Sequence, residues 1–373
     1  MDLDYALSFL LAALLSAGVI PWIVRYAHRR SLLDRPDGRK QHARAVPALG
    51  GVAVFLAVSV TAGFWLEGTS LGEAVFLFPA LSILFVTGIV DDLCELSPGR
   101  KFLFQFLAAG IVCAGGLRIR TDFGLFGIGE LDMVSSCLVT ILFITAMTNA
   151  YNLVDGVDGL LGGIALIGSA GLGFLFLQAG DGFHAALAFA LAGALAGFLR
   201  YNFYPAILFM GDTGSLLVGF LLAALGIRFF SLPLDQLAEA GVSHGFTAVA
   251  GLLFLPVFDV ARVFIIRMLK GKSPFHGDRR HLHHVLVKNG LGAPYVCLAE
   301  YGATLLFGIL SITWLQRFST ASALLLLFSL AVILAEGLTI AYLVRSRKNL
   351  RARAERFGDL RRRNRFVARL LHF

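Results

Sequence analysis

Long apolar stretches alternate with short polar segments along almost the whole chain. The apolar stretches recur near the length that crosses a hydrocarbon core of ~30 Å, and the charged residues gather between them. We therefore predict an all-α integral membrane domain over 1–344, followed by a polar tail over 345–373. The eleven predicted spans are 3–24, 48–66, 74–90, 102–117, 131–148, 159–178, 183–200, 214–231, 245–268, 295–315 and 320–343.

Composition supports a bilayer protein and excludes an ordinary soluble domain. Of the 373 residues, 57% are hydrophobic and only 15% are charged, and the mean hydropathy is +0.78. The first predicted span has no basic segment before it and no small-residue cleavage site after it. We expect it to be retained as a helix, not removed as a secretory signal.

The basic residues predict which end of each span faces the cytoplasm. Of the 32 Lys and Arg residues, 28 fall on one side, and only Arg118, Arg120, Arg228 and Arg317 fall on the other. Because cytoplasmic loops of membrane proteins are enriched in Lys and Arg, the basic side is predicted to be cytoplasmic. The amino terminus then lies outside, and the tail lies inside beside membrane lipids. No nucleic-acid fold or aromatic interleaving accompanies the basic tail, so we expect no nucleic-acid partner.

The basic side comprises the predicted loops 25–47, 91–101, 149–158, 201–213 and 269–294, which also carry the polar clusters. In the second loop, Asp91 and Asp92 are adjacent carboxylates that repel each other. Such a pair persists when a cation or a proton lies between the two groups, or when one of them serves as a base. A solvated loop is the alternative, since Asp also suits turns.

The third loop carries Asn149, Asn152, Asp155 and Asp158 at steps of three residues. On a helical turn, residues three apart share a face, so we expect all four side chains to point at one ligand. The fourth loop carries Asp212 near its end, between two glycines and before an apolar span. Its carboxylate suits Mg²⁺, and the amino terminus of the following helix favours an anion. A role for Asp212 as a helix cap is compatible with both.

Two basic clusters complete the predicted cytoplasmic face. Lys40 and His42 could meet a phosphate, although an ordinary basic loop is the alternative. The fifth loop holds Arg279, His281, His283 and His284; no cysteine is near, so we favour diphosphate binding over zinc binding. Carboxylates for Mg²⁺, basic groups for phosphates and a membrane setting together indicate phosphoryl transfer with a lipid-soluble reactant.

These motifs, in this order, resemble the polyprenyl-phosphate N-acetylhexosamine-1-phosphate transferases, particularly the WecA-like branch that starts O-antigen and related cell-envelope polymers. The resemblance rests on the runs 39–51, 91–92, 149–160, 209–215 and 273–284. It implies a multi-pass protein of the bacterial inner membrane whose cytoplasmic site transfers a sugar phosphate, most simply GlcNAc-1-phosphate, from a UDP-sugar to undecaprenyl phosphate and releases UMP. It also implies Mg²⁺ as cofactor, with Mn²⁺ as a possible substitute. It is compatible with a homodimer.

The resemblance also assigns roles to residues. Asp212 and Asn152 would hold the metal, and Lys101 would contact the diphosphate. Phe209 would stack on uracil, and Asp158 would help to read the base. Asp91 or Asp92 would deprotonate or position the lipid phosphate, with Asp155 in support. The histidine segment (His281, His283 and His284), together with Arg279, would close over the sugar and the diphosphate.

Three questions stay open at this level. The acceptor phosphate could attack directly, or an aspartate could first form a phospho-enzyme. The sugar could be another N-acetylhexosamine, since epimers differ by single hydroxyls. A transporter or lipid flippase is the competing class of protein, but its ionisable residues should lie near the middle of the bilayer, and these lie at one face.

Overall fold

The computed structural model describes residues 3–33, 45–65, 71–273 and 280–338, together with residues 340 and 344. Within these residues the fold is all-α, with one isolated β-bridge between Thr121 and Glu130. The protein is an integral membrane protein, as predicted. The helices are α1 (Leu3–Arg30), α2 (Gly50–Gly63), α3 (Leu71–Cys94), α4 (Pro98–Ala114), α5 (Met133–Val154), α6 (Leu160–Gln178), α7 (Gly182–Asn202), α8 (Gly211–Phe230), α9 (Leu234–Glu239), α10 (Gly245–Leu252), α11 (Phe254–Leu269), α12 (Leu282–Lys288) and α13 (Ala293–Ile312), followed by a helix over Thr320–Leu338.

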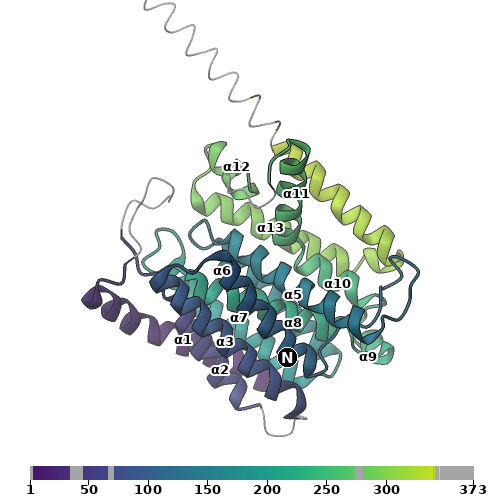
Figure 1. The fold of residues 1–373 in the computed structure, drawn as a ribbon, viewed down its shortest axis with the longest axis horizontal. Helices are drawn as coiled ribbons and strands as arrows, with labels where there is room; N and C mark the ends of the chain where they lie inside the picture. The colour runs from purple at the N-terminus through teal and green to yellow at the C-terminus, as the bar shows by residue number, and fades with distance from the viewer. Residues whose placement is uncertain are drawn as a thin grey trace, which may run out of the picture.

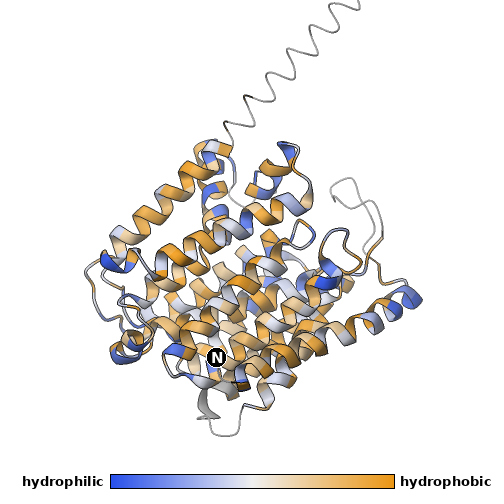
Figure 2. Ribbon diagram, turned by 180° about the vertical axis from the view of Figure 1, so that it is seen from behind, coloured by the Kyte–Doolittle hydropathy of each residue, from blue (hydrophilic) through white to orange (hydrophobic). Residues whose placement is uncertain are grey.

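Apolar residues cover most of the length of the helices, and polar residues gather at their ends (Figure 2). Among the described residues, eight helices are long and apolar enough to cross a membrane, or nine if α10 and α11 form one broken span. The other two predicted spans are α2, of 14 residues, and α4, of 17 residues. At 1.5 Å per residue both are shorter than a hydrocarbon core of ~30 Å, so the count of eleven stays a prediction.

Two helices form the centre of the bundle. In α8, 94% of the most apolar stretch is buried inside the protein, and in α7 the share is 83%, whereas in α1 it is 22%. The central helices contact α1, α2, α3, α5 and α6. In Figure 1, α11, α12 and α13 lie together at the top of this bundle, and α9 lies at the lower right.

The predicted span 245–268 is broken in the structure. α10 ends at Leu252, α11 begins at Phe254, and the two axes differ by 75°. Pro256 explains the position of the break: it has no N–H for the carbonyl of Leu252, and its ring would collide with that carbonyl in a continuous helix. The sequence predicted one span here, and the structure divides it into two helices.

Several predicted loops are shorter than expected because the helices continue into polar sequence. α3 extends through Cys94 and α4 begins at Pro98, so the predicted loop 91–101 reduces to residues 95–97. In the same way α5 continues to Val154 and α8 begins at Gly211. Hydropathy marks where the apolar stretch ends, whereas backbone hydrogen bonding decides where the helix ends.

Candidate active site

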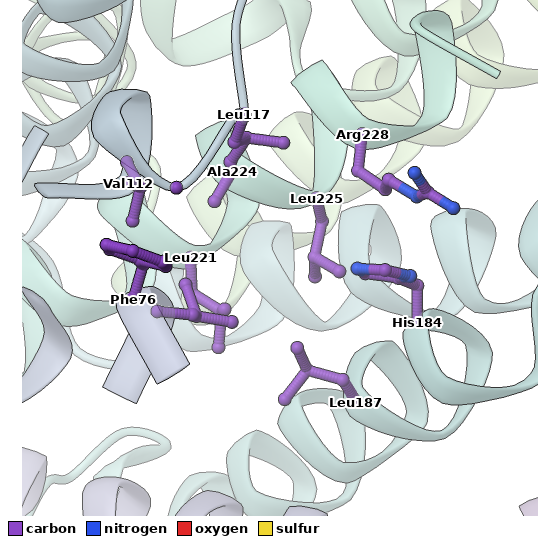
Figure 3. A pocket seen from close by; sticks show the side chains of 11 residues that line it. Phe76, Val112, Leu117, His184, Leu187, Leu221, Ala224, Leu225 and Arg228 are labelled. Atoms are coloured by element: carbon purple, nitrogen blue, oxygen red, sulfur yellow. The ribbon is translucent and has the colours of Figure 1, made fainter. Parts of the chain in front are cut away.

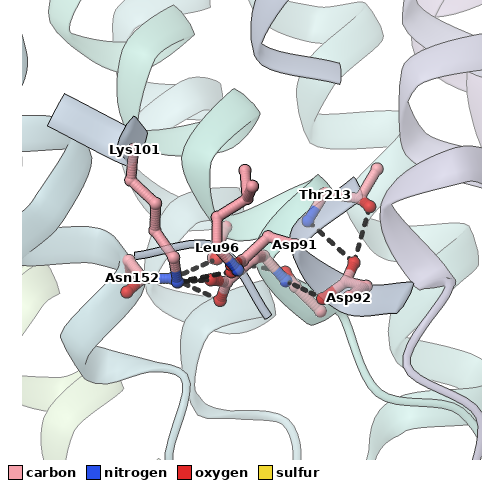
Figure 4. Close-up of polar contacts among 9 residues, drawn as sticks. Asp91, Asp92, Leu96, Lys101, Asn152 and Thr213 are labelled. Carbon is pink, nitrogen blue, oxygen red and sulfur yellow. Dashed lines mark hydrogen bonds and ion pairs between the residues drawn. The ribbon is translucent and has the colours of Figure 1, made fainter. Parts of the chain in front are cut away.

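Side chains from four helices meet where α3, α4, α5 and α8 converge (Figure 4). The Lys101 ammonium, in the first turn of α4, lies 2.5 Å from Asp212 Oδ2 and also contacts Asp91 Oδ2. The Asn152 amide nitrogen, on α5, donates to Asp212 Oδ1 at 2.8 Å and to Ser215 Oγ at 2.8 Å. Four predicted site residues, Asp91, Lys101, Asn152 and Asp212, are thus brought together from four different helices.

Local sequence explains how Asp91 and Lys101 come to face each other. Asp91 Oδ1 accepts a hydrogen bond of 2.6 Å from the Leu96 N–H, which fixes the three-residue turn between α3 and α4. Pro98 then starts α4 at a position where its missing N–H costs nothing. Three residues later, Lys101 points back to the end of α3.

Asp92 caps the amino terminus of α8 from a different helix. Its Oδ1 accepts from the Asp212 N–H at 2.7 Å, and its Oδ2 accepts from the Thr213 N–H at 3.0 Å and the Thr213 hydroxyl at 2.6 Å. The sequence predicted that this helix terminus would favour an anion. In the structure the Asp92 carboxyl group takes that place, so the terminus is already satisfied by the protein itself.

The predicted alignment of Asn149, Asn152, Asp155 and Asp158 on one helical face was wrong. α5 ends at Val154, and Asp155 is its first non-helical residue, with φ −72° and ψ 44°. Asn149 and Asn152 are still helical, but the Asn149 amide donates to Gln105 Oε1 at 2.6 Å and to the Thr145 carbonyl at 2.7 Å. Only Asn152 reaches the Asp212 cluster.

Asp155 and Asp158 lie in the turn between α5 and α6. Burial, and then the charges of Asp212, Asp92 and Asp158, raises the pKa of Asp155 to about 8. Asp158 Oδ2 accepts from the Ala206 N–H at 3.0 Å, so this side chain holds the segment that leads to Phe209.

α13 holds the same turn from the other side. The Tyr301 hydroxyl donates to the Gly159 carbonyl at 2.6 Å, and the Cys297 thiol lies 3.3 Å from the Asp158 carbonyl. Gly159 has φ 86°, a conformation that favours glycine, and its N–H donates to Asn202 Oδ1.

Phe209, the predicted uracil-stacking residue, is held by its backbone. Its N–H donates to the Pro47 carbonyl at 2.8 Å, and its carbonyl accepts from the Gly50 N–H at 2.9 Å. Two residues on, Gly211 has φ 72°, and a Cβ there would lie 2.3 Å from the Ala48 carbonyl and 2.6 Å from Asp92 Oδ2. A glycine is therefore required where the chain turns into α8.

The structure brings His281, His283 and His284 together at the start of α12. Ring centroids are 5.8 Å apart for His281 and His283 and 4.3 Å apart for His283 and His284. A Cβ on Gly156 would lie 3.0 Å from His283 Nε2, so the His283 ring lies against the turn that carries Asp155 and Asp158. The predicted binding residues Lys40, His42 and Arg279, and the tail over 345–373, lie outside the described residues.

Two polar residues at this end of the molecule were missed by the sequence analysis. Gln105 is buried one turn after Lys101 and bonds to Asn149, and Asp259 on α11 accepts from His281 Nδ1 at 2.8 Å. Each is a polar residue inside an apolar span, and that was the available signal.

The oxygen-rich chemistry of the cluster fits a hard cation such as Mg²⁺. The Lys101 ammonium already places a positive charge between the Asp91 and Asp212 carboxylates. Among the described residues no three His, Cys, Asp or Glu side chains converge on one metal position, so the remaining ligands would come from phosphate and water. Asn152 presents its nitrogen to Asp212, and its amide would have to turn over to offer an oxygen to a metal.

A small pocket lies away from this cluster, between α3, α4, α7 and α8 (Figure 3). Its walls are mainly apolar, and His184 and Arg228 contribute its polar groups. It shares no lining residue with the carboxylate cluster, so it does not belong to the candidate site.

Comparison with known proteins points to one family. A family model described as glycosyl transferase family 4 matches residues 74–230. The chain is 32% identical to a probable undecaprenyl-phosphate N-acetylglucosaminyl 1-phosphate transferase of Bacillus subtilis, over 83% of this chain and 87% of that protein. It is 31% identical to a decaprenyl-phosphate N-acetylglucosaminephosphotransferase of Mycobacterium tuberculosis, over 80% of this chain and 79% of that protein. An Escherichia coli undecaprenyl-phosphate alpha-N-acetylglucosaminyl 1-phosphate transferase is 29% identical over 83% of this chain and 84% of its own length.

Proposed function

Because the chain belongs to glycosyl transferase family 4, in the branch of the polyprenyl-phosphate N-acetylglucosamine-1-phosphate transferases, we propose that it transfers N-acetylglucosamine-1-phosphate to a polyprenyl phosphate. The donor is UDP-N-acetylglucosamine, the acceptor is undecaprenyl phosphate, and the products are UMP and a lipid-linked sugar diphosphate. The reaction takes place at the cytoplasmic face and starts a cell-envelope glycan such as O-antigen.

The observation that carries this proposal is the Lys101 ammonium held between Asp91 and Asp212 at the ends of three helices. Phosphoryl transfer between two anionic reactants needs positive charge to offset their repulsion and that of the departing group. It also needs carboxylates that can position a cation or accept a proton. The cluster supplies both.

In the proposed reaction, one oxygen of the polyprenyl phosphate forms a bond to the phosphorus that carries the sugar. The bond from that phosphorus to the oxygen bridging it to UMP breaks, and UMP leaves with this oxygen. Asp91 accepts the proton of any singly protonated acceptor phosphate. Lys101 moves from the carboxylates to the diphosphate and offsets charge on the leaving UMP.

Asp212 and the reoriented amide of Asn152 would hold Mg²⁺. The ion would neutralise charge on the diphosphate oxygens. Asp92 keeps the first turn of α8, and with it Asp212, in place through its three hydrogen bonds.

The test is release of UMP by the purified protein from UDP-N-acetylglucosamine and undecaprenyl phosphate in the presence of Mg²⁺. We expect Asp212→Ala to lose at least about a hundredfold in turnover at every Mg²⁺ concentration, since it removes the carboxylate shared by Lys101 and Asn152. Glu95→Ala is the matched control: its side chain is exposed beyond the end of α3, and most activity should remain.

Two outcomes would contradict the assignment. Absence of UMP release from any UDP-N-acetylhexosamine in a side-by-side panel would rule out the transferase. Retained turnover in Asp212→Ala would rule out the proposed role of that carboxylate. The same panel identifies the sugar, because the wild-type kcat/KM ranks the donors directly.

A further inference from the structure

A buried group of charged side chains connects α11 to the histidine segment. Asp259 Oδ2 accepts from His281 Nδ1 at 2.8 Å, and both Asp259 oxygens accept from the Leu282 N–H, at 3.0 and 3.1 Å. The exposed fractions are 4% for Asp259 and 5% for His281. One carboxylate thus fixes both the side chain before α12 and the first N–H of that helix.

Arg262, one turn along α11, completes the group. Its guanidinium lies 3.2 Å from Asp259 Oδ1 and donates to the Arg280 carbonyl at 2.7 Å. On its other side it lies 3.5 Å from Glu336 Oε1, on the last helix. The backbone from Arg280 to Leu282 is therefore tied to α11 at both ends.

This arrangement sets the orientation of the His281 ring. Because a carboxylate only accepts hydrogen bonds, Nδ1 carries the proton that faces Asp259, and Nε2 is the nitrogen left for another partner. His281 stacks on His283 with an interplanar angle of 8°, and His283 lies against Gly156. A displaced His281 ring would therefore shift the histidines that cover the turn of Asp155 and Asp158.

Stability alone does not account for these buried charges. Replacing a buried ion pair by well-packed apolar side chains is often neutral or stabilising. In contrast, removing the hydrogen-bond partner of a metal-binding histidine commonly lowers metal affinity or activity by 10- to 100-fold.

We propose that Asp259 is a positioning residue for the transfer reaction, which acts by holding His281 and the start of α12 over the site that takes the diphosphate of the nucleotide sugar. This inference rests on the proposed function. It predicts that Asp259 affects how well the enzyme uses the sugar-nucleotide donor and does not affect how it uses the lipid acceptor.

The test compares Asp259→Asn with Asp181→Asn. Asp181 is the matched control because it makes the same kind of contacts away from the site: it bonds to His184 Nδ1 at 2.7 Å and to Arg228 at 2.9 and 3.0 Å. For Asp259→Asn we expect kcat/KM for UDP-N-acetylglucosamine to fall about tenfold or more, with KM for undecaprenyl phosphate within about twofold of wild type. Asp181→Asn should leave both constants within about twofold when compared at equal folded protein.

A double-mutant cycle separates positioning from a general loss of structure. If Asp259 acts in part through His281, adding Asp259→Asn to His281→Ala should lower kcat/KM by less than Asp259→Asn does alone. Equal effects in both backgrounds, or equal effects of Asp259→Asn and Asp181→Asn, would overturn the inference.

The inference and the proposed function can fail separately. If the wild-type protein releases no UMP, the same variants are compared by calorimetric titration of UMP and UDP-N-acetylglucosamine. Weaker binding of the sugar nucleotide by Asp259→Asn but not by Asp181→Asn would support the inference even then. Equal binding by both variants would refute it.

Discussion

The four carboxylates at the candidate site are held by different partners. Asp91 and Asp212 share Lys101, Asp92 accepts three hydrogen bonds from the start of α8, and Asp155 lies at the end of α5 among the charges of its neighbours. An aspartate therefore pairs with a lysine, caps a helix or holds a proton near neutral pH, depending on what surrounds it.

The raised pKa of Asp155 predicts a pH-dependent effect on stability. Because its pKa is about 8 in the folded protein and near 3.8 when unfolded, the folded state retains the proton as pH rises through this window. The wild-type protein loses stability over the same window, and Asp155→Asn, which cannot ionise, does not. The Tm of Asp155→Asn minus that of wild type should therefore increase from pH 5 to pH 8, measured in detergent with EDTA.

Asp122→Asn provides the control for this measurement. The Ile128 N–H, joined by those of Gly124 and Phe126, holds the pKa of Asp122 below its ordinary value, so this group is ionised in both states from pH 5 to pH 8. Its Tm difference from wild type should not vary with pH. A constant difference for Asp155→Asn as well would show that Asp155 is ionised in the folded protein.

Sequence could predict which residue types form the cluster but not all of their contacts. Asp91, Asn152 and Asp212 were predicted because polar or charged groups at span ends are costly without a purpose, and Lys101 was predicted from the family resemblance. Asp259 was not predicted, because one carboxylate within an apolar span is equally consistent with a polar contact between helices. Its partner, His281, lies 22 residues later in the sequence.

Among the helices, close packing depends on glycines at a few crossings. α1 packs on α7 where Gly193 and Gly197 lie four residues apart and share a face. A Cβ on Gly193 would lie 2.0 Å from the Phe9 carbonyl oxygen, and one on Gly197 would lie 2.4 Å from that of Ala13. The two backbones are thus in direct contact, an arrangement that small residues at this spacing permit in membranes.

Gly193→Ala should destabilise the protein because the atom in its way is a backbone oxygen, which cannot rotate aside. Forcing the helices apart costs about 1–3 kcal/mol by comparison with overpacked cores, and we expect a lower Tm. Gly110→Ala is the control: it is also inside a helix, but a Cβ there would meet nothing within 4 Å, and its higher helix propensity should leave Tm unchanged or raised. Equal Tm values for the two variants would contradict the close contact.

The helices themselves were predictable, whereas the residues at which they end were not. Apolar length identified the helices, but Asp91 and Asp92 in α3 and Asn149 and Asn152 in α5 show that helical hydrogen bonding continues past the apolar stretch. Pro256 could have marked the break near Leu253, because proline acts on the turn before it.

Over the whole molecule, the distribution of basic residues predicts the orientation in the membrane. If the basic side is cytoplasmic, α9 lies outside and the end of α11 lies inside. Leu234, on α9, and Leu269, at the end of α11, are 79% and 82% exposed and so equally accessible to a reagent that reaches them. They make a matched pair for labelling.

In a variant without native cysteines, Leu234→Cys should react with a membrane-impermeant maleimide on intact cells, and Leu269→Cys only after permeabilisation. The reverse pattern would place the carboxylate cluster on the outer face. Labelling of both on intact cells would mean that α9 and the end of α11 face the same side.

The position of Asp91 at the end of a membrane-crossing helix has a consequence for kinetics. An acceptor with a long hydrocarbon chain, held in the bilayer by ~0.8 kcal/mol for each buried CH₂, reaches that position by diffusing in the plane of the membrane. Its effective concentration is a surface density, set by the ratio of acceptor to total lipid. Diluting the bilayer with inert lipid should therefore slow turnover, although the bulk concentrations of protein and acceptor stay the same.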